Sequence, residues 1–151
     1  MLGQHIITNS SGIGEIVEVT SLVDDGELYY KVEFDGHKCI NYYSVQNDQE
    51  YRLISTKKNA EKAIENFLSQ VDSIDYETTQ SKIEHQKILL QVKDICQLAS
   101  NLSMIGAEGT PHPQVSKNYK ISLNSLIEEL VFILGKSTKE ICDVLKVKKP
   151  Y

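Results

Sequence analysis

Residues 12–34, GIGEIVEVTSLVDDGELYYKVEF, contain two strand-like runs separated by a turn. In the second run, apolar and polar residues alternate, so that every other side chain shares one face of an extended chain: Leu28, Tyr30, Val32 and Phe34. The first run, residues 15–23, is rich in β-branched residues, and the DDGE segment between the runs is a turn signal. These patterns predict two strands, the second of them half-buried.

Similar signals extend on both sides of this pair. Ile6-Ile7 indicates a short strand, and Asp35-Gly36 is a strong hairpin signal. Two further strand-like runs follow, at residues 38–45 and 50–55. Five short strands joined by tight turns predict a small curled sheet or an SH3-like barrel.

The glycines that begin the quoted segment raise a chemical question. Gly12-Ile13-Gly14 could open a phosphate-binding loop, but a dinucleotide fingerprint needs a third glycine and a following helix. Here the third glycine is absent and a β-branched run follows. We therefore expect a tight corner between strands, in which Gly12 or Gly14 has a positive φ angle and no phosphate is bound.

The pattern changes to helical near Thr56, which is a suitable N-cap. Apolar residues then recur at spacings of three and four, which is typical of amphipathic helices. Gly135 indicates a helix end, and the capping-box pattern that begins at Ser137 indicates a helix start. The predicted helices lie at about 57–70, 81–102 and 116–134, with a short last helix after Ser137.

This change in pattern divides the chain into two predicted domains. Residues 1–56 are expected to form a five-stranded β domain and residues 57–151 an all-α helical domain, so the predicted fold class is α+β. Each domain is small, and we expect each to be stabilised by the other or by a partner.

Composition and spacing limit the function classes. The net charge of −5 opposes non-specific attraction to nucleic-acid phosphates. No apolar run approaches the ~18 residues that span a bilayer, and the N-terminus lacks the pattern of a secretory signal. We therefore expect a cytoplasmic protein with no membrane partner. The three cysteines are scattered and have no metal-ligand spacing, so we predict no metal site and no cofactor.

Cys39 and His37 are a candidate catalytic pair, because residues two apart share a face of a strand. A solvated turn histidine beside a core cysteine is the commoner arrangement. The sequence offers no third residue to orient the pair, so we predict no catalytic residues and no enzyme. A small enzyme that uses this pair is the alternative, and it predicts a reactive thiol.

Tyrosine usage is unusual, with eight tyrosines and no tryptophan. Tyr29-Tyr30 and Tyr42-Tyr43 lie on neighbouring predicted strands, and alternation places one ring of each pair in the core and the other outside. The two outward rings would form either a recognition surface or a cross-strand aromatic pair, and both interpretations stand at this point.

The order of these motifs resembles the CarD-like family of bacterial RNA-polymerase-binding transcription regulators. The matching segments are, in order, LGQHII, GIGEIVEV, ELYYKVEF and YRLIS. The family's usual form is V-G-D-x-V-V-Y-P-x-H-G-V-G, then a strand that ends Y-Y-V-L-x-L and a closing G-L-R-x-V-I-S. In the helical half, IEELVFILGKSTKEICDVL is similar to the family's closing pair of helices. The resemblance covers nearly the whole chain.

The resemblance implies an N-terminal five-stranded SH3/Tudor-like β-barrel that binds the β subunit of RNA polymerase. Positions at which the family carries basic residues against polymerase correspond here to Leu22 and Ile40. We expect the strand at 38–45 to pair edge-to-edge with a polymerase strand. Ile40 and Tyr42 share one face of that strand, so the expected polymerase-binding residues are Leu22, Ile40 and Tyr42.

The resemblance also implies that the helical domain approaches promoter DNA, where the family wedges a Trp with basic neighbours into the minor groove. Tyr76 is the nearest match to the wedge, and Lys82 is what is left of the basic stretch. These two are the candidate DNA-binding residues. Because the positive charge is mostly missing, we expect promoter DNA to be bound only weakly or through polymerase.

The sequence therefore predicts a transcription regulator that docks on the β subunit of bacterial RNA polymerase through its β domain. The alternative is a protein-interaction module with the same architecture and a different partner. A binding experiment with an isolated β-lobe fragment separates the two.

Overall fold

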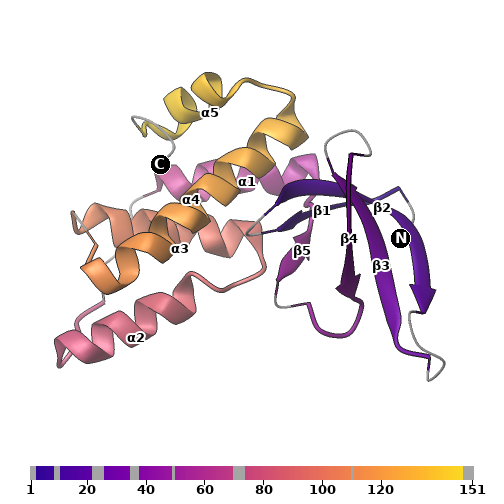
Figure 1. Ribbon diagram of the computed structural model, residues 1–151. Coiled ribbons are helices and arrows are strands. Elements are labelled where there is room, and N and C mark those ends of the chain that lie inside the picture. The colour runs from indigo at the N-terminus through magenta and orange to yellow at the C-terminus, as the bar shows by residue number, and fades with distance from the viewer. Residues whose placement is uncertain are drawn as a thin grey trace. The chain divides into compact units, whose positions relative to one another are not determined.

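The computed structural model describes residues 3–8, 11–21, 26–34, 38–48, 50–69, 74–109 and 111–147. The chain divides into two compact units, Met1–Ile54 and Ser55–Tyr151. The first unit holds the strands and the second holds the helices, which are labelled in Figure 1. The division comes two residues before the boundary that the sequence pattern indicates.

The first unit is a single antiparallel sheet whose strands have the order β4-β3-β2-β1-β5. With the five helices found among the described residues of the second unit, it makes the protein α+β, as predicted. Among the described residues, the two outermost strands do not pair, so the sheet is not closed into a barrel by hydrogen bonds. The strands are β1 (His5–Thr8), β2 (Gly12–Ser21), β3 (Leu28–Phe34), β4 (Cys39–Ser44) and β5 (Tyr51–Leu53).

Tyrosine side chains link the two outermost strands. The Tyr51 ring on β5 lies 5.6 Å from the Tyr43 ring on β4, and the Tyr51 hydroxyl donates to the carbonyl of Ser44 at 2.8 Å. Tyr30 on β3 packs edge-on against Tyr51, with the ring centres 6.1 Å apart. These rings belong to the core of the sheet, which contains Ile6, Ile16, Tyr30, Val32, Phe34, Tyr43 and Tyr51. The sheet therefore curls around an aromatic cluster.

The connection between β1 and β2 explains the two glycines that begin the quoted segment. Gly12 has a φ angle of 75°, so the predicted positive φ is confirmed there. Thr8 supports the turn, since its hydroxyl donates to the Gly12 carbonyl and accepts from the Ser11 N–H. Gly14 is required for space instead, because a Cβ would lie 2.5 Å from Val32 Cγ1. The chain continues as β2, so no helix follows to meet a phosphate.

The second unit contains α1 (Lys57–Leu68), α2 (Thr79–Leu89), α3 (Ile95–Ala107), α4 (Pro113–Leu134) and α5 (Thr138–Leu145). Three predicted helix ends are confirmed. The Thr56 side chain caps α1, Gly135 ends α4 in the left-handed conformation, and Ser137 and Glu140 form the capping box of α5. Residues from all five helices share one core. Within the described residues, no helix is long and apolar enough to cross a membrane.

The predicted long helix at 81–102 is wrong, because two helices, α2 and α3, occupy this stretch. The Asp94 carboxylate accepts from the N–H groups of Cys96 and Gln97, which starts a new helix there. The Asn101 side chain donates to the Leu89 carbonyl at 2.9 Å, which satisfies the end of α2. Ile88, an apolar residue near the end of α2, is 61% exposed. Polar caps have therefore overridden the apolar spacing.

Candidate functional site

β4 is an outermost strand of the sheet and carries two of the predicted polymerase-binding residues. Ile40 is 51% exposed and Tyr42 is 41% exposed. They lie opposite Glu33 and Lys31 of β3, on the face of the sheet that points away from the core. Leu22, the third predicted residue, lies outside the described residues. The two side chains share one face of the strand, as expected, and the structure shows that this face is the outer one.

The hydrogen-bond pattern of β4 decides which main-chain groups face outward. The Val45 N–H donates to the Leu28 carbonyl at 3.0 Å, which fixes the phase of the antiparallel ladder. By this phase, Asn41 and Tyr43 bond to β3, whereas Ile40, Tyr42 and Ser44 direct their N–H and C=O groups away from it. We call these outward groups the free edge of β4. Among the described residues, no strand pairs with it.

Two groups of the free edge already have partners within the chain. The Tyr42 N–H donates to Asn41 Oδ1 at 2.9 Å, and the Ser44 carbonyl accepts from the Tyr51 hydroxyl. The N–H and C=O of Ile40 point outward beside an exposed apolar side chain. This combination can add an extended segment to the sheet, because main-chain bonds supply affinity and the apolar side chain supplies contact area.

The tyrosine pairs follow the predicted alternation. Tyr30 and Tyr43 are 6% and 5% exposed, whereas Tyr42 is exposed and Tyr29 half-buried. Tyr29 lies opposite Ser44 and Tyr42 opposite Lys31, so the two outward rings are diagonal neighbours. The outer face of the sheet thus offers two offset rings, one on β3 and one on β4.

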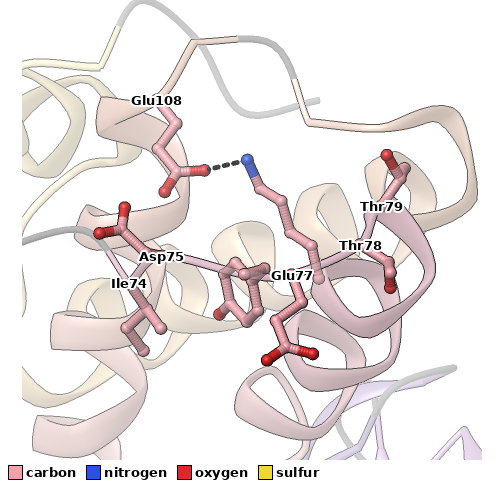
Figure 2. A pocket seen from close by; sticks show the side chains of 8 residues that line it. Ile74, Asp75, Glu77, Thr78, Thr79 and Glu108 are labelled. Carbon is pink, nitrogen blue, oxygen red and sulfur yellow. Dashed lines mark ion pairs between the residues drawn. The ribbon is translucent and has the colours of Figure 1, made fainter.

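The two predicted DNA-binding residues line one pocket, shown in Figure 2. We call it the acidic pocket, and its walls are Ile74, Asp75, Tyr76, Glu77, Thr78, Thr79, Lys82 and Glu108. It lies where α2 begins and α3 ends. Thr78 caps α2 by accepting from the Ser81 N–H, so this helix begins a little earlier than the predicted start at 81.

Both candidate residues in the acidic pocket have partners. Lys82 Nζ lies 2.7 Å from Glu108 Oε2, an ion pair drawn as a dashed line in Figure 2. The Tyr76 hydroxyl lies 2.7 Å from His85 Nδ1, with the two ring centres 5.6 Å apart. Burial raises the pKa of Tyr76, Glu108 raises it further and Lys82 lowers it.

The electrostatics of this pocket oppose a nucleic-acid backbone. Asp75, Glu77 and Glu108 supply three carboxylates, and Lys82 supplies the ammonium that pairs with one of them. Minor-groove wedging needs an apolar side chain and basic neighbours that contact phosphates. The pocket instead holds a hydrogen-bonded phenol among acidic side chains, so its chemistry favours repulsion of phosphate.

The cysteines differ from expectation at one position. Cys39 is exposed rather than in the core, because it stands at the start of an outermost strand; His37 lies outside the described residues. Burial raises the pKa of both Cys96 and Cys142. In the part of the chain that the structure describes, no group of three or more His, Cys, Asp or Glu side chains could hold a metal ion.

Sequence reasoning missed the partners of the predicted residues. The sequence patterns do not identify Asn41, Tyr51, Glu108 or His85 as partners of these residues. Asn41 is adjacent to Tyr42, so local hydrogen bonding of an Asn side chain was a usable signal. Glu108 is 26 positions from Lys82 (108 minus 82), and no pattern in the sequence joins them.

No protein-family model matches this chain, and no curated protein matches it. The resemblance to CarD-like regulators therefore stands on the order of the quoted motifs.

Proposed function

We propose that this protein is a CarD-like transcription regulator that docks on the β subunit of bacterial RNA polymerase in the cytoplasm. In this proposal the curled sheet is a Tudor-like module of the SH3 type, and the free edge of β4 receives an extended segment of the β subunit. Binding to promoter DNA by the isolated protein is weak or absent.

The exposed side chain of Ile40 on the free edge is the observation that carries this proposal. It is 51% exposed, and its main-chain groups point away from β3. Strand addition to such an edge draws affinity from hydrogen bonds, so it does not require the basic residues that the family uses. Tyr42, 41% exposed on the same face, extends the apolar contact.

The charges of the acidic pocket support the proposal that the isolated protein binds promoter DNA weakly or not at all. Three carboxylates line the pocket, and its one ammonium, that of Lys82, is already paired with Glu108. A protein that docks on polymerase still experiences a high local concentration of the promoter, so a weak contact suffices once it is tethered. The polymerase contact then contributes most of the affinity and the DNA contact little.

The test is a pull-down and titration with an isolated β-lobe fragment of bacterial RNA polymerase. Ile40→Glu should abolish binding while leaving the fold intact, because it places a charge at the centre of the contact. Leu28→Glu is the matched control: Leu28 is 45% exposed on β3, but its side chain points to the opposite face. Unfolding of Ile40→Glu, or binding equal to that of Leu28→Glu, would contradict the proposal that the β subunit docks at Ile40.

Cys39 provides a second readout in the same experiment. It is exposed and precedes Ile40, so a docked segment should slow its alkylation. Cys142 is buried with a raised pKa and serves as the internal reference. No protection of Cys39 and no binding by the wild type would instead indicate an interaction module with another partner.

A further inference from the structure

The side chain of Asn41 occupies a main-chain donor on the free edge of β4. Asn41 Oδ1 accepts the Tyr42 N–H at 2.9 Å, and this bond is exposed. The ladder phase directs that N–H outward, to the place where an added strand would present a carbonyl. Asn41 therefore competes with any segment that pairs along β4 as far as Tyr42.

The carbonyl of Ser44 is occupied in a different way. It accepts from Tyr51, whose ring is packed against both Tyr30 and Tyr43 in the core of the sheet. Tyr51 is 6% exposed, so it cannot turn away without disrupting the core. Asn41 is exposed, and rotation of its side chain releases the Tyr42 N–H at little cost.

We propose that Asn41 guards the free edge: it confines a docking strand to the part of β4 around Ile40, and must turn away before the strand can pair with Tyr42. This inference rests on the proposed docking of a β-subunit segment. Natural sheets limit unwanted strand pairing by making their edges less available, for example with bulges, charges or covering loops, and an occupied edge donor has the same effect. The guard accordingly lowers affinity for the β subunit and limits the length of the added ladder.

The guard itself can be tested without polymerase, by amide hydrogen exchange of the full chain. In Asn41→Ala the Tyr42 amide should exchange several times faster than in the wild type, because its acceptor is gone. Asn41→Asp keeps an oxygen at the same place and should preserve slow exchange. It also removes the Asn41 Nδ2 donor to the Tyr43 hydroxyl, so it controls for the loss of that long 3.4 Å bond.

The effect on docking is measured by titration with the β-lobe fragment. Asn41→Ala frees one main-chain donor, and one additional hydrogen bond should tighten the dissociation constant about fivefold. Asn41→Asp should bind close to the wild-type affinity at moderate salt. Unchanged or weaker binding by Asn41→Ala would overturn the guard.

The two measurements separate this inference from the proposed function. If neither the wild type nor Asn41→Ala binds the fragment, the proposed function fails. Hydrogen exchange of the Tyr42 amide still decides whether the Asn41 side chain accepts a hydrogen bond from the Tyr42 N–H. If the wild type binds and Tyr42 exchange is the same in Asn41→Ala, the proposed function stands and the guard is wrong.

Discussion

The free edge of β4 and the acidic pocket carry the two sets of residues singled out from the sequence. The two sites differ in whether the functional groups of these residues already have partners within the chain. Ile40 and Tyr42 keep exposed side chains, and Ile40 directs its main-chain groups outward. Lys82 and Tyr76 are instead engaged by Glu108 and His85. A residue type at the right position is therefore not enough, because a site for a partner also needs groups that the fold has left accessible.

The largest effect on this comparison is expected from a substitution that disrupts the sheet to which the free edge of β4 belongs. Gly14→Ala would place a Cβ 2.5 Å from Val32 Cγ1 and 2.6 Å from Phe34 Cε1, both in the packed core. We expect a loss of about 3 kcal/mol in the free energy of unfolding of the sheet. Near-UV circular dichroism of the tyrosines should report this loss, while the helical far-UV signal persists.

Gly12→Ala is the matched control for that experiment. Gly12 has a φ angle of 75°, so an Ala is strained there, but the cost is about 1 kcal/mol. An unchanged melting temperature in both variants would contradict the description of this turn.

A smaller effect concerns the link between the outermost strands. Tyr51→Phe removes the donor to the Ser44 carbonyl and should lower the free energy of unfolding by about 1 kcal/mol near neutral pH. Docking to the β-lobe fragment should persist, since Ile40 is untouched. Loss of docking in a folded Tyr51→Phe protein would show that the free edge depends on this link.

The pH dependence gives the same residue a second test. Burial raises the pKa of Tyr51 to about 12, with Tyr30 and Asp48 adding to the increase. In the unfolded chain a tyrosine ionises near pH 10. The protonated Tyr51 side chain therefore makes its full contribution to the free energy of unfolding below about pH 10, and this contribution is lost between about pH 10 and 12. Burial lowers the pKa of Arg52 to about 10. Its effect on the free energy of unfolding is therefore opposite to that of Tyr51 in that pH range. Because both proteins contain Arg52, the difference between wild type and Tyr51→Phe should shrink as the pH rises.

The smallest expected effect lies in the acidic pocket. Glu108→Gln removes a negative charge and releases Lys82, so affinity for a promoter duplex should rise a few-fold and its salt dependence should steepen. Fluorescence anisotropy measures both. Glu128→Gln removes an equal charge from an exposed position on α4 and should change affinity less. Submicromolar binding by the wild type, weakened by Tyr76→Ala, would show that this pocket does bind DNA.

Local patterns predicted much of the first unit because a strand's alternation is read from neighbours in the sequence. The shared face of Ile40 and Tyr42, the one inward ring in each tyrosine pair, and a positive φ at Gly12 or Gly14 all followed from this. The same reasoning failed for α2 and α3, where apolar spacing suggested one helix. There a carboxylate at Asp94 and an amide at Asn101 supplied caps whose partners apolar spacing does not reveal.

By itself, the sequence determined the α+β class, the five strands, the helix caps at Thr56 and Ser137, and the shared face of Ile40 and Tyr42, since each depends on residues close together in the chain. The tertiary structure alone decided that Lys82 meets Glu108, that Tyr51 reaches Ser44 across the curled sheet, and that Cys39 is exposed. Such contacts join residues distant in sequence or depend on which strand is outermost. They are fixed by packing of the whole unit, which minimises its exposed apolar surface, and no local pattern encodes that result.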